Sequence, residues 1–587
     1  MTIIQLPDID IPSLLAAYQR KDFTKVSEIF VQIIKHFNEC NYTQMTQDQY
    51  CKFNTYVFTI LYILTQPDFQ VPQEYARVFI NVNHILTNMV RASSLRSTQP
   101  FLDRVYSQPN NYIKILTLAT CHNELIVPIE DLFKPNAELT SLWWANYQTP
   151  AIGTLSKAVH ERVVSQLRGV PDGFVLPDFR TAPLYFQSTY FSPETDHLIK
   201  QEYNKQIRAK LSGAKIHTTP NKKSIAIICD RWQPTTAVYK SCYHQIECLA
   251  KRYDLTLVHF SQDKSNQIDM GLFKDIKRVT LQPDMTRIDY SEIKYNDFQF
   301  AYFPDVGMNY ESVCLSNMQV APIMATGYGH PVSTFGSKID YFIGGLDSEL
   351  PELAAKNYSE RLVLIPGIGA HPVFPNYTRK NSQSDKFLIN CCWTSPKINY
   401  PMLEALLTIK QQADRPIHFQ FFPSWTVTRY QACISFMRDM EQLFEGAATV
   451  YTDRPYQEYL ELMERAQITL DSYPFGGYNT IVDSLFIGCP AITLEGTRFF
   501  NRASSALMRK VNMPQCITGS IDSYIQTALD LINDTKELAR LRAQLSDIDL
   551  QALLIDNDEP QYFANAIDYL ITHHSELKGG RNPIILA

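Results

Sequence analysis

The feature that most constrains the fold is a change of hydrophobic pattern near residue 220. From about residue 10 to 215, apolar residues recur at intervals of three and four, as in VSEIFVQIIKHF and ARVFINVNHILTNMV. This spacing predicts an all-helical domain over residues 1–218. No fixed repeat period is visible on inspection, so a regular solenoid is not supported, although a degenerate helical repeat stays open.

After residue 218, short buried strands alternate with amphipathic helices. The apolar run SIAIICD (224–230) opens one such unit, predicted over 219–378, and KFLINCC (386–392) opens a second, predicted over 379–587. This alternation is typical of α/β domains with parallel sheets. Neither opening strand is followed by the Gly-x-Gly-x-x-Gly fingerprint of dinucleotide sites. We therefore expect two facing Rossmann-like domains, with a ligand at the carboxyl ends of the strands.

Composition and charge exclude several classes of protein. Hydrophobic residues make up 45% of the chain and charged residues 19%, which predicts a folded protein rather than a disordered one. A net charge of -6 argues against a nucleic-acid partner. The most apolar stretch, YVFTILYIL, is about half as long as a membrane span. The N-terminus lacks an export signal and the cysteines lack metal-type spacing, so we expect a cytoplasmic protein without a membrane span.

The strongest chemical signal lies between residues 468 and 508. A buried strand leads to a turn with Gly476 and Gly477, and Asn479 and Thr480 stand where the next helix begins. A helix N-terminus offers unpaired N–H groups and partial positive charge to an anion, and glycines allow close approach of the backbone. The pattern predicts a diphosphate site, although a plain helix cap would look the same.

Two further features of the same stretch extend this predicted site. Asp483 lies four residues after Asn479 and therefore shares its helix face, where a carboxylate can accept hydrogen bonds from ribose hydroxyls. The next strand, 491–494, leads into a second turn of small residues that contains Gly496 and Thr497. We expect both turns to contact the same nucleotide.

Lys397 and His330 also follow buried strands. Lys397, in WTSPKINYP, comes after KFLINCC, from where its ammonium group could neutralise a departing diphosphate. A solvated surface lysine would give the same sequence. His330 lies in the glycine-flanked turn GYGHPVST of the first α/β unit and could face the other domain. A purely structural histidine stays open as well.

Three ordered segments resemble glycosyltransferase family 41. They are the run DVGMNYESVCLSNMQVAPIMATGYGHPVSTFGSKIDYFIGG (305–345), CCWTSPKINYPMLEAL and YPFGGYNTIVDSLFIG. Within the family, the chain looks most like the bacterial cytoplasmic N-glycosyltransferases that modify high-molecular-weight adhesins. It is more distantly similar to the O-linked N-acetylglucosamine transferases. The likeness covers roughly residues 300–510.

The resemblance implies a GT-B fold with an N-terminal all-α domain, and an inverting, metal-independent reaction. A hexose, glucose or galactose, would pass from a UDP-sugar to Asn in Asn-x-Ser/Thr of an extended protein such as an adhesin. The resemblance also implies that Thr394, Lys397 and Asn479 bind the donor phosphates and that Asp483 binds the ribose. His330 would lie beside the sugar and the acceptor. No cofactor or metal is expected.

The chain departs from the family pattern in three places. Thr236 and Cys242 stand where histidines are expected, which leaves the catalytic base unassigned. Near the expected uracil pocket, YTDRPY (451–456) replaces a His-containing stretch, and Trp425 stands where a polar Gln is expected. Two rival functions stay open. One is an O-linked N-acetylglucosaminyltransferase acting on Ser or Thr, and the other is a helical interaction protein whose nucleotide-binding module is not catalytic.

Overall fold

The structure, a computed structural model, describes residues 6–41, 44–148, 152–179, 182–260, 268–380, 382, 384–423, 429–452, 454–557 and 559–586. The chain forms two units. Unit 1 comprises Met1–Pro177, Trp393–Leu403 and Gln420–Arg454, and unit 2 comprises Asp178–Cys392, Glu404–Phe419 and Pro455–Ala587. Because these units follow packing rather than chain order, the three domain ranges expected from the sequence stay a prediction.

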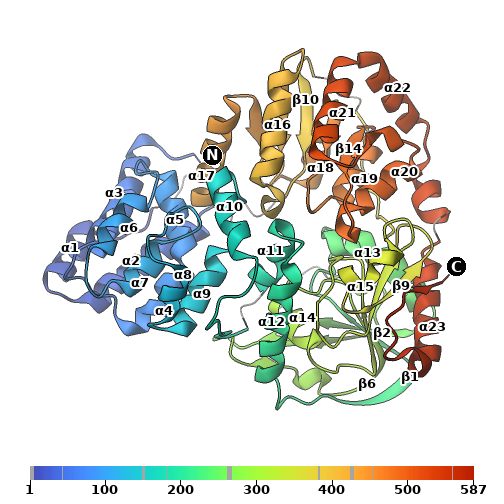
Figure 1. Cartoon of the computed structure of the whole chain (residues 1–587), viewed down its shortest axis with the longest axis horizontal. Helices are drawn as coiled ribbons and strands as arrows, with labels where there is room; N and C mark the ends of the chain where they lie inside the picture. Colours follow the sequence, from blue (N-terminus) through green and yellow to red (C-terminus); the bar gives the residue numbers. More distant parts are fainter. Residues whose placement is uncertain are drawn as a thin grey trace. The chain divides into compact units, whose positions relative to one another are not determined.

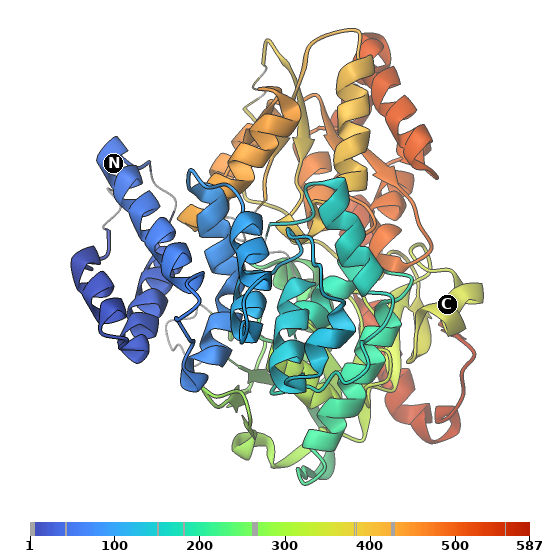
Figure 2. The same ribbon diagram turned by 60° about the vertical axis from the view of Figure 1, so that its left-hand side comes forward.

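Unit 1 begins with a run of helices, as the apolar spacing indicated (Figures 1 and 2). They are α1 (Ile11–Gln19), α2 (Phe23–Glu39), α3 (Gln47–Leu64), α4 (Gln73–Asn81), α5 (Asn83–Ala92), α6 (Gln99–Tyr106), α7 (Tyr112–Leu118), α8 (Ile129–Phe133), α9 (Ala137–Tyr147) and α10 (Lys157–Gln166). In α2, the buried residues Val26, Phe30, Ile33 and Phe37 repeat at three and four and form one apolar stripe. Burial of such stripes holds the helices together.

A later segment of the chain completes unit 1. Helix α17 (Tyr430–Phe444) packs against α5, and an ion pair joins Arg91 on α5 to Asp439 on α17. The same unit contains β12 (Ala448–Val450) and the short 3-10 turn η3 (Ser395–Lys397). Two elements, α16 (Tyr400–Gln412) and β11 (Ile417–Phe421), span the boundary between the units.

The first sheet of unit 2 is fully parallel, with strand order β16-β9-β8-β7-β6-β1-β2-β3. Helices α13 and α23 pack against its apolar strands, and the last strand, β16, brings the chain's end back to this sheet (Figure 1). The elements are β1 (His217–Ile228), α13 (Ala237–Ala250), β2 (Asp254–His259), β3 (Asp275–Arg278), β6 (Tyr295–Phe303), α14 (Tyr310–Ser316), β7 (Ile323–Thr326), β8 (Tyr341–Gly345), α15 (Ala354–Asn357), β9 (Arg361–Ile365), α23 (Gln561–Leu577) and β16 (Ile584–Ile585).

The second sheet contributes four parallel strands to unit 2 in the order β10-β13-β14-β15. Its strands are β10 (Phe387–Cys391), β13 (Ile468–Leu470), β14 (Ala491–Leu494) and β15 (Ile517–Thr518). The helices are α18 (Tyr456–Glu464), α19 (Asn479–Phe486), α20 (Ala503–Lys510), α21 (Ile521–Asn533) and α22 (Thr535–Ser546). Unit 2 thus holds two Rossmann-like domains, called here the first and the second, each built on one sheet.

Smaller elements complete unit 2. Helices α11 (Ala182–Phe191) and α12 (Asp196–Lys210) precede the first sheet, and β4 (Thr280–Leu281) and β5 (Ile288–Asp289) form a short antiparallel ribbon. The rest are η1 (Ser291–Ile293), η2 (Pro351–Leu353), η5 (Phe499–Asn501), η6 (Pro514–Cys516) and the π-helical turn η7 (Ala552–Asp556). Within the described ranges, no helix has the length and apolar character that a bilayer crossing needs.

Candidate functional site

The glycine turn after β13 is built on the carboxylate of Asp471. Its Oδ1 accepts hydrogen bonds from the backbone N–H groups of Ser472 and Gly477, both at 2.8 Å. A Cβ atom on Gly477 would lie 2.2 Å from Oγ1 of Thr480, and one on Gly476 would lie 3.0 Å from Asp471. A side chain at Gly477 would therefore clash with Thr480, whereas at Gly476 its neighbours would have to shift slightly.

The first turn of α19 faces the first Rossmann-like domain. No side chain caps the helix at Tyr478, whose hydroxyl instead donates to the carbonyl of Ala370 at 2.9 Å. The side-chain amide of Asn479 donates to the carbonyl of Ala237, at the start of α13, at 3.0 Å. The two domains of unit 2 thus meet at the helix N-terminus that the sequence predicted to bind a diphosphate.

Asp483 lies one turn along the same helix and is buried, with 7% of its surface exposed. Its Oδ1 accepts a hydrogen bond from the hydroxyl of Tyr456, at the start of α18. Burial raises the pKa of Asp483 to about 6, while the charge of Lys240 and the Tyr456 hydrogen bond oppose that rise. The carboxylate is therefore ionised only above mildly acidic pH.

Lys240 is a neighbour of this carboxylate that the sequence alone did not identify. Its Nζ lies 3.4 Å from the centroid of the Tyr456 ring, in the geometry of a cation–π contact. Lys240 belongs to α13 and Tyr456 to α18, so the contact joins the two domains. The only sequence signal was indirect, since Lys240 lies in the segment DRWQPTTAVYKSCYH that departs from the family pattern.

The second predicted turn is engaged in contacts within unit 2. A Cβ atom on Gly496 would lie 2.5 Å from the side chain of Asn501, so this position also requires glycine. The carbonyl of Thr497 accepts a hydrogen bond from the side chain of Asn357, on α15, at 2.8 Å. Thr497 itself is exposed, and its backbone links the second domain to the first.

Thr394 and Lys397 lie in unit 1. Thr394 precedes η3, and the backbone N–H of Lys397 donates to its carbonyl at 2.8 Å. The carbonyl of Ile398 accepts a hydrogen bond from the backbone of Thr154 at 3.0 Å, so this turn packs on the helical part of unit 1. Because Gly476, Gly477, Asn479, Thr480 and Asp483 belong to unit 2, their convergence with Lys397 stays a prediction.

His330 is a buried, neutral imidazole. Its Nδ1 lies 2.9 Å from the carbonyl of Val306, which fixes the tautomer with the proton on Nδ1. Burial first, and then the charge of Lys200, lower the pKa of His330 to about 3. The ring stacks on Phe186 of α11 at 4.5 Å between centroids. Nε2 is buried and has no hydrogen-bond partner among the described residues, so it presents a lone pair.

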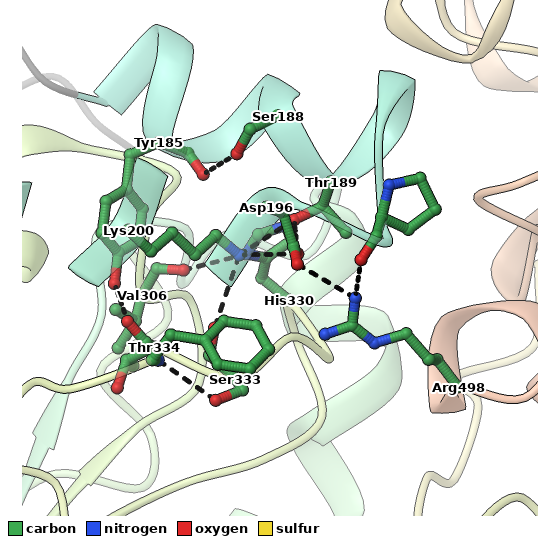
Figure 3. A network of polar contacts seen from close by, with 12 residues as sticks. Tyr185, Ser188, Thr189, Asp196, Lys200, Val306, His330, Ser333, Thr334 and Arg498 are labelled. Carbon is green, nitrogen blue, oxygen red and sulfur yellow. Dashed lines mark hydrogen bonds and ion pairs between the residues drawn. The ribbon is translucent and has the colours of Figure 1, made fainter. Parts of the chain in front are cut away.

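A buried polar network supports the turn that carries His330 (Figure 3). Lys200 of α12 is fully buried, and its Nζ donates to Oγ1 of Thr189 at 2.9 Å and to the carbonyl of Ser333 at 3.4 Å. Asp196 lies one turn before Lys200, at 3.6 Å from its ammonium group. The other oxygen of Asp196 accepts from Arg498 of the second domain at 3.1 Å. The network therefore ties α11 and α12 to both Rossmann-like domains.

A second acidic group, also missed from the sequence, lies at the carboxyl ends of β1, β2 and β6. Asp305 is fully buried and accepts hydrogen bonds from the backbone of Asp230 at 3.1 Å and of Arg231 at 3.3 Å. Burial raises the pKa of Asp305 to about 6. The Oδ1 of Asp230 lies 3.3 Å from Nε2 of His259. Each aspartate comes two residues after the buried end of a strand, which is the signal that could have found it.

Comparison with known proteins supports the resemblance found in the motifs. No protein-family model matches the chain. The chain is 22% identical over 491 residues, 79% of its length and 77% of the relative's, to the UDP-glucose:protein N-beta-glucosyltransferase of Actinobacillus pleuropneumoniae serotype 5b. It is 29% identical over 242 residues, 39% of its length and 26% of the relative's, to the Arabidopsis thaliana protein SPINDLY, named a probable UDP-N-acetylglucosamine–peptide N-acetylglucosaminyltransferase.

A solved structure extends the likeness to the fold. A mutant of the Thermobaculum terrenum O-GlcNAc transferase superposes with a TM-score of 0.59 at 15% identity, over 93% of this chain and 97% of that one. The predicted GT-B fold with a helical N-terminal region is thereby confirmed. The resemblance to family 41 is confirmed too, since the relatives are the two kinds of protein glycosyltransferase that the motifs indicated.

Proposed function

We propose that this chain is a glycosyltransferase that moves a sugar from a UDP-sugar to a protein. The observation that carries the proposal is the element from Gly476 to Asp483, at the carboxyl end of β13. It combines a closely packed glycine turn, a helix N-terminus and a carboxylate on one helix face. These are the groups that bind a diphosphate and a ribose. The names of the relatives support the same reaction class.

In the proposed donor complex, positive charge surrounds the departing diphosphate. The partial charge at the start of α19 and the amide of Asn479 would face its oxygens, and Lys397 would add a full charge. Thr394 and Lys397 come three and six residues after β10, which pairs in parallel with β13 through Ile389 and Ile468. Both strands therefore end at the same edge of the sheet, which supports placing their following turns around one ligand.

The Asn479 amide can meet the donor phosphates in one of two ways. Its Nδ2 carries two N–H donors, and in the structure it donates to the carbonyl of Ala237. A phosphate oxygen would take the free donor or replace this carbonyl. In the second case, donor binding would break this contact between the two domains of unit 2.

We propose a single displacement that inverts the anomeric centre. The side-chain nitrogen of an Asn in Asn-x-Ser/Thr attacks the anomeric carbon of glucose or galactose while the bond to the UDP oxygen breaks. The amide proton passes to a base, and UDP leaves with the electron pair. No metal or cofactor takes part in this proposal, in which the donor-site dipoles and Lys397 carry the charge. An extended adhesin is the proposed acceptor.

His330 fits an orienting role better than a basic one. An imidazole with a pKa near 3 holds a transferred proton poorly at neutral pH, but its Nε2 lone pair can accept a hydrogen bond. Asp305 and Asp230, on the side of the first domain, are better candidates for the base. The raised pKa of Asp305 lies closer to the working pH of a general base.

The test uses the purified full-length protein. It is incubated separately with UDP-glucose, UDP-galactose and UDP-N-acetylglucosamine, together with an Asn-x-Thr peptide or a matched Gln-x-Thr peptide. Intact mass and fragmentation then locate the added sugar. We expect one hexose on Asn and none on the Gln peptide. N-acetylhexosamine on Thr would support the O-linked alternative, and the absence of UDP release with every acceptor would support the non-catalytic one.

A further inference from the structure

Two helix faces meet where the domains of unit 2 come together at the proposed donor site. On α13, Ala237 and Lys240 are three residues apart and share one face, and on α19, Asn479 and Asp483 are four apart and share another. Asn479 contacts the carbonyl of Ala237 at 3.0 Å. One turn further along each helix, Lys240 and Asp483 approach the same aromatic side chain.

Tyr456 is that side chain, and it joins the two charges. Its hydroxyl donates to Oδ1 of Asp483, while its ring face receives the ammonium group of Lys240 at 3.4 Å from the centroid. A cation on the ring face draws electron density from the ring, and a carboxylate accepts from the hydroxyl, so each contact strengthens the other. The tyrosine is held in one orientation by a group from each domain.

We propose that Lys240 is a positioning residue of the donor site, which reaches across from the first Rossmann-like domain to orient Tyr456 and to keep the carboxylate of Asp483 available to ribose hydroxyls. This inference rests on the proposed function, because it assigns a nucleoside diphosphate to that site. It adds a group from the first domain to a site otherwise built from the second. Recognition of the nucleotide then requires both domains.

The charge balance around Asp483 supports this role. The titratable groups that face it are Lys240 from α13, Tyr456 and Tyr459 from α18, and Cys392 after β10. Burial raises the pKa values of Tyr459 and Cys392 well above their usual range, so both stay neutral. Within the described residues, Lys240 is the cation that opposes the rise in the pKa of Asp483. Without it, the carboxyl group would bind a proton at higher pH.

The experiment measures the affinity of full-length protein for UDP by calorimetry between pH 5 and 8. The variants are Lys240→Met, Lys240→Gln and Lys240→Arg, with Lys251→Met as the control on the same helix. Lys251 caps the C-terminal end of α13 and is largely exposed. Thermal unfolding shows whether each variant is folded. Two neutral replacements are used so that the test can still be made if one of them does not fold.

We expect both neutral variants to bind UDP about twofold more weakly at pH 7 and nearly tenfold more weakly (about ninefold) at pH 5, as a rise of about one unit in the pKa of Asp483 from its value near 6 implies. The midpoint below which UDP affinity falls should move to higher pH in both, whereas Lys240→Arg and Lys251→Met should match the wild type. In an Asp483→Asn background, Lys240→Met should have no further effect, because the carboxylate on which it acts is gone.

Three results would overturn the assignment of Lys240. They are wild-type affinity in both neutral variants, a weaker affinity with an unchanged pH midpoint, or an undiminished effect of Lys240→Met in the Asp483→Asn background. The second and third results would mean that Lys240 acts on the fold rather than on Asp483. Failure of the proposed donor site is distinguishable, because the wild type itself would then bind no UDP at any pH. Failure of the transfer reaction alone appears only in the peptide assay above and leaves the UDP titration intact.

Discussion

Replacement of Asp196 by Asn tests the buried network in Figure 3 most directly. Asp196 and Lys200 are both fully buried, and Lys200 has Thr189 and the Ser333 carbonyl as its other partners. Asn keeps the size of the side chain but removes its charge, so the ammonium group loses the carboxylate that pairs with it and keeps only the weaker effect of buried Glu360. Breaking a buried ion pair on one side costs about 3–5 kcal/mol of unfolding free energy. We expect the loss in this variant to fall in that range.

Lys200→Met should be much less damaging, because Asp196 keeps two partners. Its Oδ2 still accepts from Thr189 at 2.7 Å, and its Oδ1 still accepts from Arg498 at 3.1 Å. Met also fills most of the space of the lysine stem. The double variant should be more stable than Asp196→Asn alone, since it strands no ammonium group. The expected order of stability is wild type, Lys200→Met, the double variant, then Asp196→Asn.

The pH dependence supplies an independent check on the same pair. Burial lowers the pKa of Lys200 to about 8, and Asp196 opposes this effect, so the pKa should fall further in Asp196→Asn. The folded variant then releases the proton at lower pH than the unfolded chain does. Stability rises with pH wherever the unfolded state binds more protons. The deficit of Asp196→Asn should therefore shrink as the pH rises from 7 towards 9.

Urea unfolding followed by circular dichroism at pH 7, 8 and 9 measures these differences, with all four proteins compared under identical conditions. The reasoning would be refuted if Lys200→Met lost as much stability as Asp196→Asn. It would also be refuted if the two losses simply added in the double variant, because independent contributions exclude a coupled ion pair.

The remaining predictions concern the donor site. Lys397→Ala should lower kcat/KM for transfer by about 10²–10³, as loss of a charge-stabilising group does, while the protein stays folded by calorimetry. UDP affinity of the wild type should be constant above pH 7 and fall as the pH drops through about 6. The reason is that Asp483 is then protonated and no longer accepts a hydrogen bond from the ribose. A titration that shows no such fall would exclude this role of Asp483. Gly477→Ala should abolish UDP binding, since its Cβ would lie 2.2 Å from Oγ1 of Thr480, and Thr480→Ala in the same chain should restore part of it.

Local sequence patterns predict whether each region is helical or built of alternating strands and helices. The helical run before residue 215, the buried second half of β1 (224–228) and the strands that begin at 387 and 468 were predictable, because periodicity and burial of short segments depend on neighbouring residues. The exposed first half of β1, from His217, was not predicted. The glycine turn at 476–477 was predictable for the same reason. The two glycines, the start of the helix and Asp483 all lie within one short stretch of the chain. The helix face shared by Asn479 and Asp483 therefore follows from their spacing of four residues alone.

Contacts between groups that are distant in the chain could not be predicted from local patterns. Lys240 and Tyr456 are far apart in the chain, as are Asp196 and Arg498, and the closing segment at β16 returns to a sheet begun at β1. The state of His330 also depended on the fold, because burial beside Phe186 and Lys200 lowers its pKa. Contacts and burial of this kind depend on which faces of separate elements pack together, and local spacing carries no information about that choice.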